Sequence, residues 1–510
     1  MAHDFDRRSV LAGLAAAAAT GPVRAETGPV RLSVRSREIL NRIPADYVGF
    51  SAETAQLGDP SFYHPANQSL IALHRRLSAN GVLRLGGNSS EFCWWKPTPG
   101  TMPPEVKALG LGRTDNWMPQ QFTAIAPEAV RNLKGFLDAC GWRCIWGLNF
   151  GTGSPERDAE EAAAVAAILG PKLLYFQIGN EPDFYREANN LLRPKGWNFP
   201  DYLNEWTAIA ESVAAKVPDA RFGGPDVGAA SNWVVRFARE APKRIGKRLV
   251  ALSGHYYASG PPDAPSVTIA NLLRRNDAAA RRMAEILPAA RAAGLSYRIT
   301  EANSCYRGGK PGMSNAFAAA LWGADYMLDM AAHGAGGINF HGGPGRMIAA
   351  SLGGKLPGAK SDADRDHARL GSFYSPIAGS RETGFSARPL FYGMMLAERF
   401  AGGAMTAADF APGAVNAAAY AVRTAKGFRI AVLNKDATRD LKTAVDIDGK
   451  APARARLWRL CAPALDAVRG IRFAGSDVAP GTAAWRPQTE TADGATFVVP
   501  HASAALIFAE

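Results

Sequence analysis

Cysteine is scarce in this chain, and charges of one sign never gather into long runs. The five cysteines follow no metal-ligand spacing and are Cys93, Cys140, Cys144, Cys305 and Cys461. An odd number cannot pair completely within one chain, and we expect Cys140 and Cys144 to be buried apolar side chains rather than a disulfide. Charged residues make up 20% of the 510 residues, and their even spread argues against a disordered chain or a polyelectrolyte tail.

Long hydrophobic runs are missing as well. No stretch beyond the N-terminus is long and apolar enough to anchor the chain in a membrane. A short Ala-rich run over residues 11–19 follows Arg7 and Arg8 and leads to small residues before Ala25. This order predicts a twin-arginine export signal over residues 1–25, and therefore a periplasmic or secreted protein, the alternative being a retained N-terminal helix.

The overall charge does not identify a partner. The net charge is +12, but the basic residues are scattered along the chain, so we expect no nucleic acid. An acidic small or polymeric substrate accounts for the surplus equally well. The sequence has neither a metal-ligand cluster nor a dinucleotide-binding spacing, and we expect no metal and no cofactor.

Eight strand-like segments alternate with amphipathic helices from residue 47 onward. The strand segments are YVGFSAE, GVLRLGGNSS, RCIWGLNF, LLYFQIGNEP, RFGGPDV, LVALSGHYY, SYRITEANS and GGINFHGG. The helices, which repeat apolar residues every three or four positions, are expected at 127–139, 159–169, 202–217, 277–293 and 314–332, with a last one in LFYGMMLAERF. Eight such units predict an α/β fold in which residues 47–402 form a (β/α)8 barrel.

The pattern changes after residue 402 to short alternating strands separated by Gly and Pro turns. The clearest of them are GFRIAVLNKD, LKTAVDIDG, ARARLWRL and GATFVVPHASAALIFAE. They predict a small antiparallel β-sandwich over residues 403–510. The alternating segment VRLSVRSREI lies before the barrel, within residues 26–46, and is expected to add a strand to this sandwich.

Two carboxylates end strands of the predicted barrel, where the active site of such a fold is built. Glu181 follows the fourth strand in FQIGNEPDFY, where Pro182 is expected to keep it extended, and Glu301 lies on the seventh in YRITEANS. Each could be an ordinary surface ion pair. Two carboxylates facing one another over a pocket are, however, what glycoside cleavage needs: one protonates the leaving oxygen and the other attacks the anomeric carbon.

These motifs, with several others, resemble a known family. GNEP and TEANS are similar to the clan of retaining barrel glycosidases. FSAE, LRLGGNSSEF, SGHYY, TEANSCYRGGKPG and VPHASAAL resemble, more narrowly, glycoside hydrolase family 79, the β-glucuronidase and heparanase group. The resemblance spans nearly all of the chain after the export signal. It implies that Glu181 is the acid/base and Glu301 the nucleophile.

The resemblance also implies sugar-binding residues. Asn180 would bind the 2-hydroxyl, and Tyr257 would donate a hydrogen bond to the nucleophile and keep its pKa low. The strand-end side chains that would bind outer hydroxyls are Glu53, Asn88, Ser89 and His341. Residues of this kind are as often local caps or hydrogen-bonded wall.

A uronic acid adds a carboxylate that needs hydrogen-bond donors. In the family a Tyr-Gly pair just after the nucleophile supplies them, and here SCYRGG has Tyr306, then Arg307 in place of the usual glycine, and then Gly308. The Arg307 guanidinium would add a charge-assisted hydrogen bond. The segment 342–383 is expected to wall one end of the cleft.

We therefore expect a retaining β-glucuronidase that acts on a glycoside or polysaccharide containing glucuronic acid. The alternatives are a neutral-sugar glycosidase of the same clan, such as an arabinofuranosidase or xylosidase, and a non-catalytic binder of acidic polysaccharide.

Overall fold

The computed structural model describes residues 28–103, 117–119, 121–186, 192–478, 485–492 and 494–509. The predicted export signal over residues 1–25 lies outside this range. None of the helices in the described part of the chain combines the length and the apolar character that crossing a membrane requires. Cys140 and Cys144 are buried free thiols, as expected.

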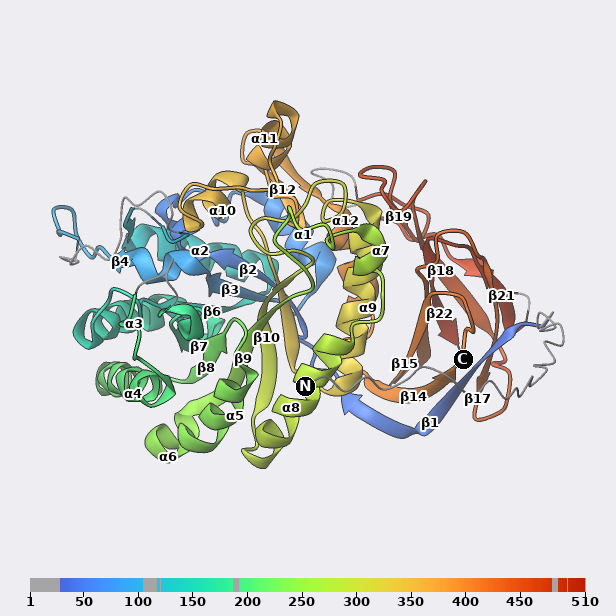
Figure 1. The fold of residues 1–510 in the computed structure, drawn as a ribbon, viewed down its shortest axis with the longest axis horizontal. Coiled ribbons are helices and arrows are strands. Elements are labelled where there is room, and N and C mark those ends of the chain that lie inside the picture. The colour runs from blue at the N-terminus through green and yellow to red at the C-terminus, as the bar shows by residue number, and fades with distance from the viewer. Residues whose placement is uncertain are drawn as a thin grey trace, which may run out of the picture.

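The eight predicted strands are all present and close into a barrel in which neighbours pair in parallel (Figure 1). In order around the barrel they are β10 (Ser296–Asn303), β11 (Gly337–His341), β2 (Val48–Glu53), β3 (Val82–Gly86), β6 (Arg143–Leu148), β7 (Leu173–Ile178), β8 (Phe222–Val227) and β9 (Leu249–Tyr257). Nearly all of their residues are buried, because helices cover one face of the strands and the barrel interior covers the other. The predicted (β/α)8 barrel is confirmed.

Helices cover the outside of the barrel. The longer ones are α1 (Gln68–Leu77), α2 (Pro127–Cys140), α3 (Pro155–Leu169), α4 (Phe199–Lys216), α5 (Ser231–Glu240), α8 (Asp277–Ala292), α9 (Phe317–His333) and α12 (Pro389–Glu398). The short ones are α6 (Pro242–Ile245), α7 (Ile269–Leu272), α10 (Gly345–Ser351), α11 (Asp362–Arg369), η1 (Thr54–Gly58), η2 (Asn88–Phe92), η3 (Gly170–Lys172), η4 (Pro182–Phe184) and η5 (Gly246–Arg248). α2 shows why they stop where they do: it starts on Pro127 and ends at Gly141, whose φ of 83° only glycine adopts without strain.

A second, ten-stranded sheet follows the barrel. Its members are β1 (Val30–Arg42), β14 (Ala404–Phe410), β15 (Ala417–Thr424), β16 (Gly427–Asn434), β17 (Leu441–Ile447), β18 (Ala455–Cys461), β19 (Arg472–Phe473), β20 (Glu490–Thr491), β21 (Thr496–Val499) and β22 (Ser503–Ala509). A compact apolar core that includes Leu32, Val432 and Ile507 fills this domain. Two strand pairs, β4 (Cys93–Trp95) with β5 (Thr123–Ile125) and β12 (Ile377–Ser380) with β13 (Gly384–Ala387), lie outside both main sheets.

The N-terminal strand joins this second domain, as expected, but not in a wholly antiparallel way. β1 pairs antiparallel with β14 along one edge and parallel with β17 along the other. β1 comes from before the barrel, so no hairpin fixes its direction relative to β17, and the parallel arrangement is open to it. The sheet is therefore mixed at this one pair.

The two domains share a firm contact through α9. Figure 1 shows α9 and α12 between the barrel and the second sheet. The first backbone N–H groups of α9, those of Phe317 and Ala318, donate to the carbonyls of Ala467 and Leu465 at 2.8 Å. Further along the helix, Asp325 pairs with the ammonium group of Lys435 at 2.5 Å. The helix that follows strand β10 is thus capped and paired by the second domain.

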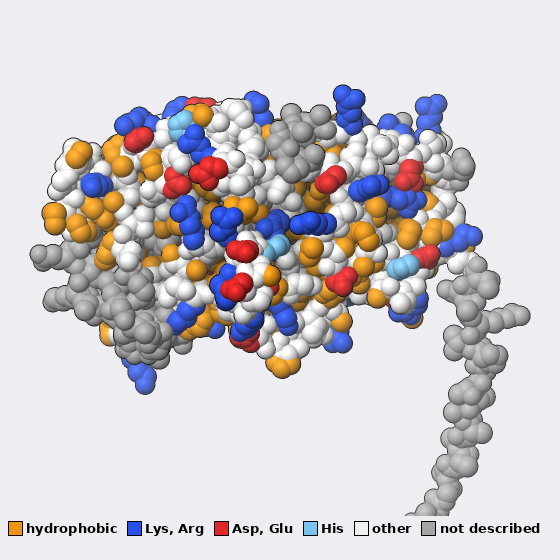
Figure 2. Space-filling view, turned by 90° about the horizontal axis from the view of Figure 1, so that it is seen from above, with side chains coloured by type: hydrophobic (Ala, Val, Ile, Leu, Met, Phe, Trp, Pro, Cys, Tyr) orange, Lys and Arg blue, Asp and Glu red, His pale blue; other side chains and the backbone are white. Residues whose placement is uncertain are grey.

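The surface carries mixed charge. Figure 2 shows Lys and Arg side chains gathered over the middle of the face seen from above, with acidic side chains among them. A surface of this kind fits the scattered basic residues of the sequence and has no single-sign field over the whole face.

Candidate active site

A cavity of about 660 Å³ lies at the C-terminal ends of the barrel strands, because the last residues of β2, β9 and β11 line it. This volume is in the usual range of small-molecule sites. Eight of the predicted site residues line it: Glu53, Asn88, Glu181, Tyr257, Glu301, Tyr306, Arg307 and His341. The other three, Asn180, Ser89 and Gly308, do not. The segment 342–383 forms part of the wall through Ile348, Ser351, Leu352 and Tyr374.

Glu181 sits in a left-handed turn just past the end of β7. Its φ is 49° and its ψ is 50°, so the expectation that Pro182 keeps it extended is wrong. Pro182 instead begins the short helix η4, and the backbone N–H of Glu181 donates to the carbonyl of Asp226 at 2.9 Å. A positive φ is uncommon for a residue other than glycine and persists only where surrounding contacts enforce it.

Asp183 supplies one set of those contacts. Its carboxylate accepts hydrogen bonds from three consecutive backbone N–H groups, those of residues 228–230, at 2.8 to 2.9 Å. These residues follow β8, so Asp183 ties the turn after β7 to the turn after β8. The carboxylate of Asp183 is buried and its hydrogen bonds are charge-assisted, which makes this a strong local clamp.

Glu91 supplies the other set from the opposite side. This fully buried carboxyl group accepts a hydrogen bond from the backbone N–H of Asn180 at 2.5 Å and another from that of Gly151. Burial raises the pKa of Glu91 to about 7, against the hydrogen bonds from Tyr185 and the two backbone groups, which lower it. Glu91 lies in LRLGGNSSEF, but nothing in that segment alone indicates which backbone groups its carboxyl contacts.

Glu301 is the second carboxylate of the cavity and lies on β10. The Tyr257 hydroxyl donates to its Oε1 at 2.7 Å, and the Arg84 guanidinium donates to its Oε2 at 2.7 Å. The predicted contact between Tyr257 and Glu301 is therefore present. The shortest approach of Glu301 to Glu181 is compatible with a shared substrate, since one oxygen of each and one nitrogen of His255 all lie within 4.8 Å of one another.

Arg84 is the central cation of the site and was missed from the sequence. Its guanidinium donates to Glu301, to Asp226 at 2.5 Å and to the side-chain oxygen of Asn180 at 2.7 Å. The side chain is 1% exposed. The sequence holds one indication of this role: Arg84 is the single charged residue in the apolar strand VLRLG. An arginine buried in such a strand needs buried acidic partners.

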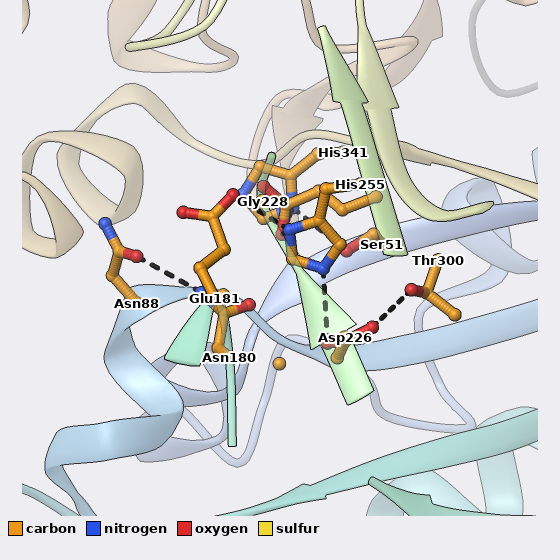
Figure 3. A network of polar contacts seen from close by, with 12 residues as sticks. Ser51, Asn88, Asn180, Glu181, Asp226, Gly228, His255, Thr300 and His341 are labelled. Carbon is orange, nitrogen blue, oxygen red and sulfur yellow. Dashed lines mark hydrogen bonds and ion pairs between the residues drawn. The ribbon is translucent and has the colours of Figure 1, made fainter. Parts of the chain in front are cut away.

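His255 bridges the two halves of the site (Figure 3). Its Nδ1 lies 2.9 Å from Glu181 Oε1 and its Nε2 lies 3.1 Å from Asp226 Oδ2. Burial alone would lower the pKa of His255, but the negative charges of Asp226 and Glu301 raise it to about 10. The ring is therefore an imidazolium that donates one hydrogen bond to the carboxyl group of Glu181 and one to the carboxylate of Asp226. His255 lies in SGHYY, and the sequence of this motif alone does not predict its contacts with Glu181 and Asp226.

The surroundings separate the pKa values of the two candidate catalytic carboxyls. Burial raises the pKa of Glu181, and the hydrogen bond from His255 only partly opposes this. Burial also works against ionisation of Glu301, but the positive charges of His341, His255 and Arg84 lower its pKa to about 2. The surroundings thus favour the protonated form of Glu181 and the ionised form of Glu301, which is the division of roles that an acid and a nucleophile need.

The far end of the cavity is built around Glu53. Its Oε2 accepts hydrogen bonds from the hydroxyl and backbone N–H of Ser89, at 2.6 and 3.0 Å, and its Oε1 lies 3.2 Å from His341 Nε2. Ser89 therefore orients Glu53 and does not face the cavity itself. Asn88 does face it, and its side-chain oxygen accepts a hydrogen bond from Asn180 at 3.2 Å.

The residues that follow Glu301 and β10 form one wall of the cavity. Tyr306 and Arg307 both line it, together with Trp117. The guanidinium carbon of Arg307 lies 3.7 Å from the centre of the Trp117 ring, a cation–π contact. Gly308, with φ at 89°, turns the chain away, and its carbonyl accepts a hydrogen bond from the Tyr374 backbone. The phenol and the guanidinium are thus the donors available here.

Glu181, His255 and Glu301 also form a group that could surround a metal ion by distance alone. The chemistry of the donors does not suit one. Both nitrogens of His255 already face carboxylates, and the raised pKa keeps the ring protonated, whereas a metal needs a neutral imidazole. The three residues fit a proton-transfer site better than a metal site.

Comparison with known proteins gives two relatives in sequence. The chain is 28% identical to a β-glucuronidase of Aspergillus niger over 362 residues, which is 64% of this chain and 64% of that protein. It is 28% identical to a β-glucuronidase of Neurospora crassa over 346 residues, 61% of this chain and 60% of that protein. The chain thus matches somewhat less than two thirds of the length of each relative. No family model matches the chain.

Solved structures share the fold over almost the entire chain. A 4-O-α-L-rhamnosyl-β-D-glucuronidase from Fusarium oxysporum 12S superposes with a TM-score of 0.69 at 16% identity, over 93% of this chain and 99% of that one. A family 51 arabinofuranosidase from Xanthomonas axonopodis pv. citri gives 0.63 at 17% identity, over 94% of this chain and 100% of that one. The relatives in sequence confirm the resemblance expected from the motifs: the chain is similar to two β-glucuronidases and shares its fold with solved glycosidases, a barrel joined to a second β-sheet domain.

Proposed function

We propose that this protein is a retaining β-glucuronidase that removes β-linked glucuronic acid from a glycoside or an acidic saccharide. The observation that carries the proposal is the pair of carboxyls in one cavity whose pKa values are pushed apart, Glu181 upward and Glu301 to about 2. Retaining glycosidases use two carboxyls about 5–5.5 Å apart, and inverting ones use a wider pair. The close approach of Glu181 to Glu301 supports retention.

The mechanism follows from these positions. Glu301, ionised, attacks the anomeric carbon while Glu181 gives its proton to the leaving oxygen. The bond from the anomeric carbon to that oxygen breaks, and a glycosyl ester forms on Glu301. A water molecule then gives a proton to Glu181 and attacks the same carbon, which frees the sugar and restores both carboxyls. The Asn180 amide lies just outside the residues that line the cavity, where Arg84 donates to its oxygen and its nitrogen donates to the cavity-lining Asn88, and we assign the 2-hydroxyl of bound substrate to this amide.

The uronate preference rests on the donors beside the nucleophile. Tyr306 and Arg307 line the cavity, and they offer a phenol and a permanently charged guanidinium to a carboxylate. The relatives in sequence carry the name β-glucuronidase, which supports the same choice. A site built to pair a carboxylate rejects a matching neutral sugar, because its donors are then left unpaired.

A panel of aryl glycosides tests the proposal: β-glucuronide, β-glucoside, β-xyloside and α-arabinofuranoside, with early product followed by proton NMR. We expect kcat/KM on the glucuronide to exceed that on the glucoside by at least about a hundredfold, and the first sugar released to be the β-anomer. Comparable rates on glucuronide and glucoside would move the assignment to a neutral-sugar glycosidase. An initial α-anomer would refute retention, and binding without turnover of any substrate would indicate a non-catalytic protein.

A further inference from the structure

The leaving-group side of the cavity is the side on which Glu181 lies, because in the proposed mechanism this residue protonates the departing oxygen. Phe184 lines the cavity on the same side. A Cβ placed on Gly228 would clash with the Phe184 ring and would fall 2.9 Å from Glu181 Oε1, so the ring and the carboxyl are neighbours. Glu53 and His341, at the far end, belong to β2 and β11, which lie across the barrel from β7 and β8.

The backbone groups of the turn after β8 are already engaged within the protein. The N–H groups of residues 228–230 all donate to the carboxylate of Asp183, at 2.8 to 2.9 Å. The carbonyl of Gly228 accepts a hydrogen bond from Nη1 of Arg282 at 3.1 Å. The other two nitrogens of that guanidinium, Nε and Nη2, are buried. The polar groups of this turn therefore face the protein and not a leaving group in the cavity.

The side chains on this side of the cavity present apolar surface. Phe184 is half-buried and Ala229 is exposed, and both line the cavity. Tyr256 lines it as well, but its hydroxyl donates to the side-chain oxygen of Asn276 at 2.6 Å. The ring of Tyr256 is stacked on that of Tyr326, with centroids 5.4 Å apart, which fixes its position. A leaving group beside Glu181 thus meets two aromatic rings and a methyl group.

This surface suits an aromatic leaving group better than a sugar. A sugar carries several hydroxyls, which lose water on binding and need hydrogen-bond partners in exchange. A phenol or other aromatic alcohol brings a flat apolar ring, which needs no such partners and gains from contact with another ring. The cavity volume of about 660 Å³ is in the range of sites that enclose a drug-sized ligand, so an aromatic ring system fits beside the glucuronic acid.

We propose that Phe184 forms a leaving-group subsite that takes an aromatic alcohol rather than a second sugar. The inference rests on the proposed function and narrows its substrate class to glucuronides of phenols and similar flat apolar alcohols. Phe184 supplies the ring against which the leaving group packs. Asp183 acts on the same choice indirectly, because it holds the three backbone donors that a leaving sugar would need.

The test measures binding rather than turnover, so that the different reactivities of phenol and sugar leaving groups do not enter. In the Glu301→Gln background, calorimetry gives the affinities for 2-naphthyl β-glucuronide, methyl β-glucuronide and the disaccharide β-glucuronosyl-(1→3)-galactose. The three ligands share the glucuronic acid and differ only in the leaving group. The same affinities are measured after Phe184→Ala, after Phe184→Tyr, which keeps the ring, and after Phe428→Ala, a matched change of a half-buried phenylalanine in the second domain.

We expect the naphthyl glucuronide to bind at least about tenfold more tightly than either other ligand, and Phe184→Ala to remove at least about fivefold of that affinity. Phe184→Tyr and Phe428→Ala should retain it, and methyl glucuronide, too short to reach the ring, is the reference.

A disaccharide that binds as tightly as the naphthyl glucuronide, or naphthyl binding unchanged by Phe184→Ala, overturns the inference. Should Phe184→Ala fail to fold, the comparison of the three ligands alone decides. Failure of the proposed function is distinguishable, because the unmodified protein would then not hydrolyse 4-nitrophenyl β-glucuronide, whereas failure of this inference leaves that activity intact.

Discussion

The imidazole Nδ1 of His255 lies 2.9 Å from Oε1 of Glu181. Because the pKa of His255 is raised to about 10, this contact places a cation beside the group that, in the proposed mechanism, gives up a proton in the first half of the reaction. The cation does not prevent Glu181 from holding its proton, since burial dominates. In the proposed mechanism the cation would stabilise the carboxylate left on Glu181 after proton transfer, which would then serve as the base for water.

The enzyme should be most active at acidic pH, because the pKa values of Glu181 and Glu301 set the limits of its pH range. Glu301, with its pKa lowered to about 2, stays ionised down to that pH, and Glu181, with its pKa raised, keeps its proton above the ordinary value. We expect kcat/KM on an aryl glucuronide to hold through the mildly acidic range and to fall as pH rises through the pKa of Glu181. A profile that stays flat to pH 9 would contradict the assignment of Glu181 as the acid.

The two carboxyls should fail differently when replaced. Glu301→Gln should abolish turnover of every substrate, because no covalent intermediate can form. Glu181→Ala should retain more activity on 2,4-dinitrophenyl glucuronide, whose leaving group scarcely needs a proton, and azide should rescue its second step. Steady-state rates with and without azide measure this, and an equal, unrescued loss in both variants would remove the assignment.

Asp226 should be a large contributor to stability. It is 1% exposed and accepts hydrogen bonds from Arg84 and Thr300 at 2.5 Å, besides facing the imidazolium of His255. Asp226→Asn leaves two buried cations short of one negative charge, and we expect the free energy of unfolding to fall by about 3–5 kcal/mol. Chemical denaturation measures it. The exposed Glu211→Gln, the matched control, should change it by less than about 0.5 kcal/mol.

The contact between Asp226 and His255 also predicts how the stability of the protein varies with pH. The negative charges of Asp226 and Glu301 raise the pKa of His255 to about 10. The stability that this interaction contributes is fully present below the unfolded pKa of about 6.5 and is lost as pH rises through 10. Thermal melts of the unmodified protein between pH 7 and 10 should therefore fall, and Asp226→Asn should fall less over that range. Identical slopes would show that His255 is not held as a cation.

Glu91 should act on turnover without touching the substrate. Its carboxyl group accepts hydrogen bonds from the backbone N–H groups of Asn180 and Gly151. Glu91→Gln would place the side-chain NH₂ group against one of these two donors. We expect kcat to fall by up to about a hundredfold, because small misplacements of catalytic groups are that costly, with KM nearly unchanged. The pKa of Glu91 is raised to about 7, so its stability contribution is lost as pH rises through 7. Melting curves of the variant should lack that pH dependence, which a purely local packing defect would not remove.

Tyr306 and Arg307 should control the preference for uronates to different degrees. Tyr306→Phe should lower the ratio of glucuronide to glucoside kcat/KM mainly by slowing the glucuronide. Arg307 stacks on Trp117, so Arg307→Lys, which keeps the charge but loses the planar stack, separates a packing role from a charge role. If neither Tyr306→Phe nor Arg307→Ala changes the ratio, the uronate is recognised elsewhere in the cavity.

The barrel and its two glutamates were predictable because their signals are local. Each barrel strand is a short apolar run that ends in polar or glycine residues, and a carboxylate placed directly after such a run, as at Glu181, stands out in a single window. The conformation of Glu181 was not predictable in the same way. Its left-handed φ follows from contacts with residues 226–230, which lie on the next strand and its turn.

The polar network beneath the cavity could not be deduced from the sequence. Asp226 lies 142 residues and His255 171 residues after Arg84. Their contact depends on the register of the barrel strands from β3 through β6, β7 and β8 to β9. The alternation of residue types along one strand predicts which face of the sheet a side chain points to. It does not predict which residues of other strands lie at the same level in the barrel, because that depends on the register between strands. An arginine inside an apolar strand indicated that acidic partners exist, and only the closed barrel identifies them.

The capping of α9 by Ala467 and Leu465 has a consequence for the architecture. The helix that follows β10, the strand of Glu301, takes the carbonyl partners of its first N–H groups from the loop between β18 and β19 of the second domain. A barrel expressed without the last hundred residues would begin that helix with two unpaired donors and an uncovered apolar flank. The second domain is therefore not a detachable accessory module that could be added or lost, and the smallest unit able to hold Glu301 and the helix after it in place is the pair of domains together.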